Sequence, residues 1–283
     1  MSEVDTIDFS RPGPSTVTTL MADLHAAGLK AGDIVLVHSA LSKIGWVAGG
    51  PVAVVQALMR ILTPDGTLMM PTHTGDNSDP AYWVAPPVPE SWWSIIRDEM
   101  PAYDPAITPT RAMGAIVEAF RTFRGVVRSA HPAVSFAAWG RYAHELTAEH
   151  HPEVDLGEGS PLARLYDHDG YVMLIGVDHG NNTSLHLAEY RAQFPWARWE
   201  PQGAAMLVNG QRRWVSYRRM DFSDHDFAAM GAEYEREIGY RPSRLGQAEL
   251  RLLRQRPLID YAVSWLKAHR TPPQEPIDMP LGS

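Results

Sequence analysis

The sequence predicts an α/β or mixed α+β fold in three layers, with ligands bound beyond the ends of the strands. Three short segments, residues 33–37, 67–71 and 171–177, are almost continuously apolar. Such segments are typical of strands buried on both faces, as in a parallel sheet covered by helices. Segments with helical spacing lie between them, which is the alternation that builds a layered sheet.

The first half of the chain contains a strand, helix, strand unit. A helix is expected over residues 15–27, where apolar side chains recur at helical spacing and Gly28 follows as a terminator. The strand at 33–37 is followed by a helix at 52–62 and then by the strand at 67–71. This order predicts a right-handed parallel crossover.

The middle of the chain starts with a long irregular segment. Residues 72–110 are rich in proline and tryptophan and have little periodicity, so we expect an excursion that covers a site. A helix is then expected at 111–121. The strand at 171–177 leads through a polar loop to a helix at about 183–192, which again places polar groups at the carboxyl end of a strand.

The last third combines a hairpin with helices. Residues 203–217 alternate apolar and polar side chains around Asn209-Gly210, which predicts a hairpin attached to the main sheet as a meander. Three further helices are expected, at residues 230–236, 247–253 and 258–268. The proline-rich tail, residues 271–283, is expected to be mobile or loosely packed.

Composition removes several classes of function. The chain has 283 residues, 45% of them hydrophobic, and no apolar run near the roughly 18 residues of a membrane span. Its acidic start lacks the features of a signal peptide, so a cytoplasmic protein is expected. The absence of cysteine excludes disulfides, thiolate metal sites and a cysteine nucleophile. A net charge of −8 disfavours nucleic acid and suits a cationic small molecule.

A helix that starts near Asn182 carries the sharpest local pattern. An asparagine cap would place Thr183, His186 and Glu189 on one face within the first two turns. A carboxylate beside an imidazole can fix its tautomer, and an oriented imidazole is what a general base requires. The alternative is an ordinary surface pair between His186 and Glu189, and the spacing alone leaves both interpretations open.

Two other segments offer chemistry with weaker patterns. His38 and Ser39 follow the first strand, but adjacent strand residues point to opposite faces, and no G-x-S-x-G turn supports a serine nucleophile. Arg128, Ser129, His131 and Ser135 offer a cation and hydroxyls suited to phosphates or to the pantetheine arm of a cofactor. Kinase and dehydrogenase phosphate loops are absent.

Histidines and carboxylates elsewhere allow two further hypotheses. A metal site could be drawn from His150 and His151 with Asp155, or from His179 with His186 and Glu189, but neither spacing is a strong ligand motif, so no metal is expected. The acidic and aromatic group of Asp221, Asp224, Asp226, Tyr234 and Glu235 could bind a polyamine or could be a solvated face.

Six motifs, taken in order, resemble the aminoglycoside 3-N-acetyltransferase family, and the similarity runs from about residue 15 to residue 269. They are Val37-His38-Ser39-Ala40-Leu41 with Gly49-Gly50-Pro51, Gly66-Thr67-Leu68-Met69-Met70-Pro71-Thr72, Arg128-Ser129-Ala130-His131-Pro132, Gly159-Ser160-Pro161, Leu174-Ile175-Gly176-Val177, and Asn182-Thr183-Ser184-Leu185-His186-Leu187-Ala188-Glu189.

The resemblance implies a three-layer α/β/α sandwich around a mixed, largely parallel sheet, with a smaller substrate lobe. One acetyltransferase domain would span residues 1–270, and its lobe would combine residues 195–245 with the excursion at 72–110. Acetyl-CoA, the co-substrate, would lie along two loops. Their contacting residues would be His38, Ser39, Ala40, Leu41 and Ser42 in the first loop, and Arg128, Ser129, His131 and Ser135 in the second.

The resemblance also implies a mechanism. His186, oriented by Glu189, would accept the proton of an aminoglycoside amine as the amine attacks the thioester, without a metal or a covalent enzyme intermediate. Thr183, Ser39 or backbone N–H groups of residues 39–42 would stabilise the oxyanion. The other ammonium groups would be bound by carboxylates, namely Asp76, Asp79, Glu189, Asp224 and Asp226. The protein would act as a monomer or homodimer.

Three other functions remain open at this point. A protein of the same fold could acylate another amine, for example in antibiotic biosynthesis. A hydrolase could act through Ser39 or through a metal. A CoA-binding sensor could use the same loops without catalysis, and it would not depend on His186.

Overall fold

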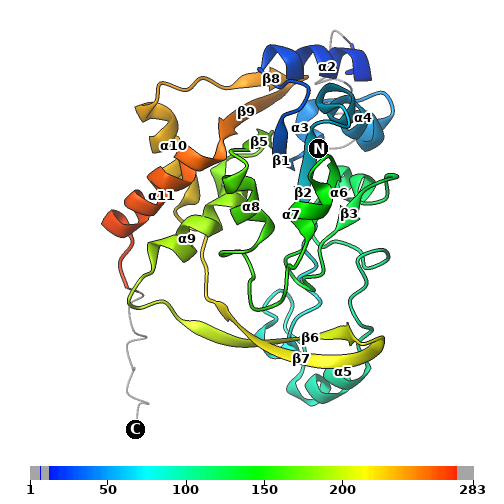
Figure 1. The fold of residues 1–283 in the computed structure, drawn as a ribbon, viewed down its shortest axis with the longest axis vertical. Coiled ribbons are helices and arrows are strands. Elements are labelled where there is room, and N and C mark those ends of the chain that lie inside the picture. Colours follow the sequence, from blue (N-terminus) through cyan, green and yellow to red (C-terminus); the bar gives the residue numbers. More distant parts are fainter. Residues whose placement is uncertain (1–6, 8–12, 273–283) are drawn as a thin grey trace.

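The computed structural model describes residue 7 and residues 13–272, and a seven-stranded sheet forms its centre (Figure 1). The strand order is β3, β4, β2, β1, β5, β9, β8. The strands are β1 Ile34–Ser39, β2 Thr67–Pro71, β3 Val127–Arg128, β4 Phe136–Gly140, β5 Tyr171–Ile175, β8 Ser243–Leu245 and β9 Ala248–Arg254. β1 is parallel to β2 and β5, whereas β4 and β9 flank these three antiparallel. The mixed sheet and its three predicted central strands are confirmed.

Side chains of β1 alternate between two hydrophobic cores, one on each face of the sheet. Val35 and Val37 belong to one core, and Ile34 and Leu36 belong to the other. Because both faces are covered, residues 34–38 of β1 are all buried, which explains the continuous apolar run at its start. The two cores make the molecule a three-layer structure.

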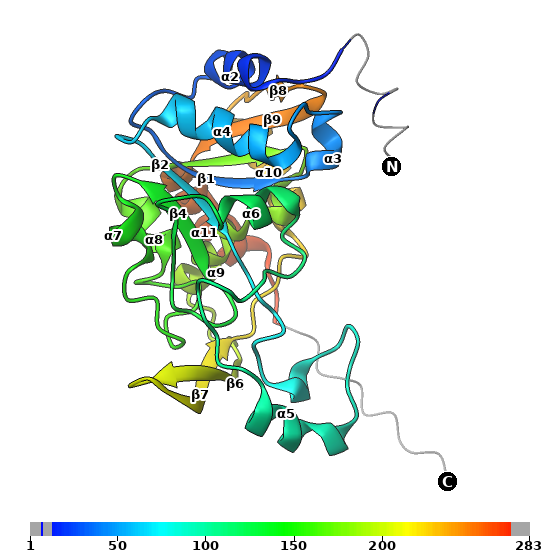
Figure 2. The ribbon, with the colours of Figure 1, turned by 90° about the vertical axis from the view of Figure 1, so that its right-hand side faces the viewer.

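Helices cover both cores (Figure 2). The core of Val35 receives side chains from α2 Val17–Ala26, α4 Gly50–Leu62 and α6 Ala115–Phe120. The opposite core receives them from α7 Ala143–Thr147, α8 Pro161–Asp167, α9 His186–Ala192, α10 Phe227–Glu237 and α11 Gln255–His269. A short helix, α3 Leu41–Ile44, follows β1. Among the described residues, no helix has the length and apolar character needed to span a bilayer.

A hairpin and the excursion form a separate part of the molecule, seen below the main sheet in Figure 2. The hairpin consists of β6 Trp199–Val208 and β7 Gln211–Met220. At its turn, Asn209 and Gly210 have φ of 52° and 74°, the left-handed conformation that tight hairpin turns require. The two strands form a sheet of their own, so the expected attachment to the main sheet is wrong.

The hairpin is hydrogen-bonded to the excursion. The backbone N–H of Tyr103 donates to the carbonyl of Ala205 at 2.8 Å, and Nε of Arg212 donates to the carbonyl of Met100 at 3.0 Å. The excursion itself contains only short elements, which are η1 Pro80–Tyr82, η2 Glu90–Trp92 and α5 Trp93–Glu99. These contacts bring two segments that are about 100 residues apart into one lobe.

Some element predictions need correction. The expected helix at 247–253 is strand β9 in the structure. β9 pairs antiparallel with β5, with Ile175 opposite Leu250. The pairing arises because β5 lies in the interior of the sheet and needs a second neighbouring strand. The expected helix at 111–121 is shorter, beginning at Ala115. The helix at 183–192 is a 3-10 turn, η4 Thr183–Leu185, followed by α9. Residues 273–283 of the predicted tail lie outside the described residues.

Candidate active site

Polar side chains gather at the carboxyl ends of the central parallel strands. His38 and Ser39 are the last residues of β1, and His73 follows shortly after β2. At the end of β5, Gly176 has φ of +65°, and a Cβ there would clash with the side chain of Lys43. Glycine therefore permits the turn that leads from β5 towards α9. Because parallel strands end at the same edge, this edge is where a ligand is expected.

His186 and Glu189 form a buried dyad in the first turn of α9. Nδ1 of His186 lies 2.5 Å from Oε2 of Glu189, and both residues are buried. Phe222 and Phe227 pack against the imidazole, with ring centroids 4.5 and 4.9 Å away. When the Nδ1–H group of His186 donates this hydrogen bond to the carboxylate, Nε2 carries the lone pair that can accept a proton. The surface-pair alternative is wrong, because this pair is buried.

The Glu189 carboxylate is held by two further groups. The backbone N–H of Ser223 donates to Oε1 at 2.9 Å, and the guanidinium of Arg270 also donates to Oε1. Arg270 in turn forms an ion pair with Asp226, in which its Nε lies 2.9 Å from Oδ2. Glu189 is thus fixed from both sides, and its charge is partly balanced inside the protein.

His38 and His73 lie near the dyad and are held neutral. Burial lowers the pKa of His38 to about 3, and the charges of His186 and His179 lower it further. Burial also lowers the pKa of His73 to about 3, with added effects from His186 and His38. The Nε2 atoms of both rings and Oγ of Ser39 are buried without hydrogen-bond partners among the described residues. Unpaired buried polar atoms mark a position where a ligand or water can bind.

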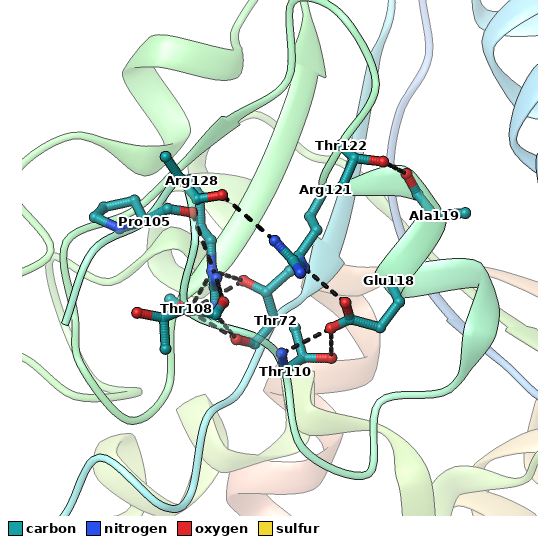
Figure 3. Close-up of polar contacts among 11 residues, drawn as sticks. Thr72, Pro105, Thr108, Thr110, Glu118, Ala119, Arg121, Thr122 and Arg128 are labelled. Atoms are coloured by element: carbon teal, nitrogen blue, oxygen red, sulfur yellow. Dashed lines mark hydrogen bonds and ion pairs between the residues drawn. The ribbon is translucent and has the colours of Figure 1, made fainter. Parts of the chain in front are cut away.

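Arg128 joins the excursion to the main sheet (Figure 3). Its Nη2 donates to the carbonyl of Thr72 at 2.7 Å, and its Nη1 donates to the carbonyl of Thr108 at 2.5 Å. Nε lies 3.1 Å from Oγ of Ser135. The guanidinium therefore donates its hydrogen bonds to protein oxygens, and it would have to give up some of these bonds to hold a phosphate. Our interpretation of Arg128 as a ready phosphate ligand does not match this geometry.

The other polar residues of the 128–135 loop are also turned inward. Oγ of Ser129 lies 2.9 Å from Nδ1 of His150, and Nδ1 of His131 accepts two backbone N–H groups of the following turn at 3.1 Å. Oγ of Ser135 donates to the carbonyl of Thr72 at 2.8 Å. Ser129, His131 and Ser135 are fully or almost fully buried. Nε2 of His131 has no hydrogen-bond partner among the described residues, but the other hydrogen bonds named here go to protein atoms and hold the loop inside the protein.

Three of the four aspartates expected to bind ammonium groups have an arginine partner. The pairs are Asp76 with Arg111, Asp79 with Arg97, and Asp226 with Arg270. Asp224 is exposed and makes no ion pair within the described part of the chain. A carboxylate that is already paired contributes less net charge to a cationic ligand, because its arginine would have to be displaced.

The family model described as "Aminoglycoside 3-N-acetyltransferase" matches residues 36–267. The chain belongs to the aminoglycoside 3-N-acetyltransferase family. The matched region begins in β1, ends in α11 and includes the His186–Glu189 dyad, the excursion and the hairpin. Since the relatives are acyltransferases by name, the protein is an acyltransferase.

Individual relatives cover nearly the whole chain. The SPbeta prophage-derived aminoglycoside N(3')-acetyltransferase-like protein YokD of Bacillus subtilis is 45% identical over 89% of this chain and 92% of its own. Aminoglycoside N(3)-acetyltransferase IX of Micromonospora chalcea is 36% identical over 95% and 99%, respectively. A solved structure, "AAC-IIIb binary with CoASH", is 29% identical, has a TM-score of 0.82, and is matched over 93% of this chain and 100% of that one.

The acetyltransferase has a hollow of about 540 Å³ beside α3. Leu41 and Ser42 line it from α3, and Gly49 and Gly50 line it from the start of α4. The backbone N–H of Ala40 donates to the carbonyl of Ile175 at 2.9 Å, which fixes this loop on β5. The hollow lies on the loop predicted to hold acetyl-CoA, and that assignment stays a prediction.

A second hollow, of about 410 Å³, lies between the excursion and the hairpin of the acetyltransferase. Arg219 and Gln202 line it from the hairpin, and Nε of Arg219 and Oε1 of Gln202 are buried without partners in the described residues. The Arg219 guanidinium lies 4.9 Å from the ring of Phe222, which packs against His186. This hollow is therefore one aromatic side chain away from the dyad.

Three residues of this region, Arg219, His73 and Arg270, were not predicted from the sequence. His73 follows a predicted strand and could have been found by the argument that selected His38. Arg219 and Tyr217 share a face of β7, and the alternation of the hairpin indicates this without showing what they contact. For Arg270 the sequence offers no pattern, since 81 positions separate it from Glu189.

Histidines considered as metal ligands are hydrogen-bonded to other protein groups, and the serine considered as a nucleophile has no base beside it in the described part of the chain. Nε2 of His179 lies 3.0 Å from Glu235, and His150 lies between Ser129 and the carbonyl of Asp155. Within residue 7 and residues 13–272, no three His, Asp or Glu side chains are grouped as metal ligands. Oγ of Ser39 has no base as a partner there. The geometry therefore gives the hydrolase hypotheses no support.

Proposed function

We propose that this acetyltransferase transfers the acetyl group of acetyl-CoA to the 3-amino group of the 2-deoxystreptamine ring of an aminoglycoside. The observation that carries the proposal is the buried dyad, in which Nδ1 of His186 lies 2.5 Å from Glu189 at the ligand-binding edge of the sheet. The names of the relatives support the acceptor, and the CoASH complex of a solved relative supports the donor.

The proposed transfer is direct. The free amine attacks the thioester carbonyl carbon, and Nε2 of His186 takes a proton from the amine nitrogen as the new C–N bond forms. The C–S bond then breaks, and the CoA thiolate leaves and takes the proton from Nε2 of His186, which returns the imidazole to its neutral form. Glu189 stabilises the imidazolium in between, because its carboxylate faces Nδ1. No covalent intermediate on the protein is required.

We propose oxyanion donors and cofactor contacts on the first loop. Ser39 has a hydroxyl without a protein partner, and Thr183 lies one turn before His186. Backbone N–H groups of residues 39–42 are further candidates. His38, Ala40, Leu41 and Ser42 would contact acetyl-CoA, and the 128–135 loop would support the site from inside. Since the reaction consumes acetyl-CoA, we keep the cytosol as the proposed compartment.

Acceptor recognition is proposed to depend on Asp224. This side chain is exposed, and the N–H of its neighbour Ser223 donates to Glu189, so an ammonium group near the dyad would be within its proposed reach. Asp76, Asp79 and Asp226 would each have to give up an arginine to do the same. Glu189 is buried and is engaged by three donors, which favours the orienting role over substrate binding.

One observation favours a second candidate acceptor. Arg111 and Arg219 line the 410 Å³ hollow, and Asp76, the acidic residue there, is paired with Arg111. A hollow with an unpaired arginine suits an amine that carries few positive charges or has an anionic group at its far end. The same dyad would then acetylate an amine other than a polycationic aminoglycoside.

An acceptor panel tests both candidates. Thiol release from acetyl-CoA is measured with 2-deoxystreptamine aminoglycosides and with amino sugars that carry a phosphate or carboxylate. The acetylated nitrogen of each product is then located by NMR. Acetylation at position 3 with the highest kcat/KM among aminoglycosides supports the first candidate. A preference for the anionic amino sugars, or acetylation at another nitrogen, would replace it by the second.

A further inference from the structure

We propose that Arg270 is a positioning residue that holds the Glu189 carboxylate in the orientation in which it supports His186. This inference rests on the proposed function of His186. Arg270 follows α11 directly and donates to Oε1 of Glu189, while Oε2 of the same carboxylate lies 2.5 Å from Nδ1 of His186. The cation therefore contacts the dyad on the side away from the imidazole.

Arg270 is fixed by partners of its own. Its Nε lies 2.9 Å from Oδ2 of Asp226, its Nη2 also contacts Oδ1 of Asp226, and Nη2 donates to the carbonyl of Ser223 at 2.9 Å. Only 11% of the Arg270 side chain and 12% of the Asp226 side chain are exposed. A planar guanidinium bound at both edges has little freedom to rotate, so it can fix the carboxylate beyond it.

Ser223 closes the network through its backbone. Its N–H donates to Oε1 of Glu189 at 2.9 Å and its carbonyl accepts from Arg270, so the residues just before α10 touch both partners. Other titratable side chains lie nearby: His225 has an exposed ring with Nε2 3.8 Å from Asp226, and Arg198 and Asp221 line the same hollow as Glu189 and Arg270. The path from His186 to Asp226 thus consists of direct contacts among buried or nearly buried groups.

The charges along this path alternate in sign. Before the transfer, the neutral imidazole leaves two carboxylates, Glu189 and Asp226, against the single cation of Arg270. When His186 accepts the proton, the path has two cations and two anions in alternation. A buried network is more stable when its charges are balanced and hydrogen-bonded. Arg270 lies between the two carboxylates of this path and keeps Glu189 from turning away from His186.

A double-mutant cycle tests this assignment. We expect Arg270→Gln to lower kcat by about 10- to 100-fold, because a small misplacement of a catalytic group can lower the rate by about that factor. The KM of the acceptor should change by less than about 3-fold, because the proposed role acts through Glu189 and requires no contact with the substrate. On a Glu189→Gln background, the same substitution should lower kcat by less than about 3-fold, since Arg270 acts through that carboxylate. Arg270→Lys, which keeps the charge, should recover part of the activity.

Arg191→Gln is the matched control. Arg191 belongs to α9, like the dyad, and its Nε forms an ion pair with Glu158 at 2.6 Å on the surface. Its replacement should leave kcat within about 2-fold of the parent, as surface pairs contribute little. Should Arg270→Gln fail to fold by circular dichroism, Asp226→Asn takes its place in the cycle, with a smaller expected loss of kcat that is again coupled to Glu189→Gln.

Two results would overturn the inference. One is an equal fold-loss of kcat from Arg270→Gln in the parent and in the Glu189→Gln background, which is the behaviour of an independent structural contact. The other is a rise in acceptor KM at unchanged kcat, which would make Arg270 a substrate ligand. If His186→Ala itself retains normal turnover, the proposed function fails first. A loss with His186→Ala and none with Arg270→Gln removes only this inference.

Discussion

Arg270 and Glu189 form an ion pair although 81 positions separate them in the chain. Glu189 lies in the first turn of α9, and Arg270 follows the last helix. The contact joins a residue near the end of the described chain to the carboxylate that lies 2.5 Å from Nδ1 of His186. The packing of α11 against α9 brings this contact about.

Replacement of the proposed base should affect turnover much more than donor binding. We expect His186→Ala to lower kcat by at least about 100-fold, because general-base assistance contributes about 10² to 10⁴. Binding of CoA, measured by calorimetry, should be nearly unchanged. His168→Ala is the control, since His168 also lies 2.7 Å from a glutamate, Glu145, but near the surface. Near-normal turnover of His186→Ala would remove the central proposal.

Removal of the Glu189 charge should have a smaller effect. Glu189→Gln keeps a polar group beside Nδ1 of His186 but loses the charge that stabilises the imidazolium. We expect kcat to fall by about 10-fold or more, yet by less than in His186→Ala, because the base is misoriented and not deleted. Single-turnover measurements separate this loss from product release. A loss larger than that of His186→Ala would make Glu189 itself the base or a substrate ligand.

Removal of metal ions should leave the reaction intact. The chain has no cysteine, and direct transfer by His186 assigns no step to a metal. The measurement is thiol release after incubation with EDTA and desalting, compared with an untreated sample. Activity that is lost with EDTA and restored by Zn²⁺ would return the metal-dependent hydrolase to consideration.

Acceptor binding should depend on salt and on Asp224. The net charge of −8 attracts a cationic acceptor over distance, and this attraction is screened over about 10 Å at 0.1 M salt. We expect acceptor KM to rise between about 0.02 and 0.5 M NaCl, with a smaller change in kcat. Asp224→Asn should raise KM and flatten this dependence, because its charge is unpaired.

The control for Asp224 is Asp65→Asn. Asp65 is also exposed, but it lies in the turn before β2, at the opposite end of the strand from the site. It should keep the parent KM and the parent salt dependence. If Asp224→Asn behaves like this control, the acceptor is not bound through that carboxylate, whereas the dyad assignment stands.

The stability of the fold should decrease in acid because of its buried neutral histidines. The pKa values of His38 and His73 are lowered to about 3 from 6.5, so the folded state binds fewer protons than the unfolded state between these values. The free energy of unfolding should then fall as the pH is lowered from about 6.5, by up to about 1.4 kcal/mol per pH unit for each histidine. The stabilisation is fully present above pH 6.5.

Urea denaturation at pH 7.5 and pH 5.5 measures this effect. His38→Gln should reduce the difference between the two pH values, because one buried neutral imidazole is gone. His144→Gln is the control, since His144 is exposed on α7. Equal pH dependence of His38→Gln and the parent protein would show that His38 is hydrated or paired in solution.

The sequence by itself determined the central strands and the spacing that lets His186 meet Glu189, whereas the burial of this pair came from the structure. A strand buried on both faces needs apolar side chains at nearly every position, so the strands were predicted from the sequence at residues 33–37, 67–71 and 171–177, the last of which ends at Ile175 in the structure. His186 and Glu189 are three residues apart in one helix, and local spacing fixes whether such residues can meet. The positions of both features therefore followed from short-range geometry.

The tertiary structure alone decided which groups are free to act. Arg128 and Asp226 have the chemistry of ligand-binding residues, but Thr72, Thr108 and Arg270 occupy them from distant parts of the chain. The same long-range pairing turned residues 248–254 into β9, since β5 needed a neighbour. Local spacing carries no information about such partners, because packing brings them together only after the layers have formed.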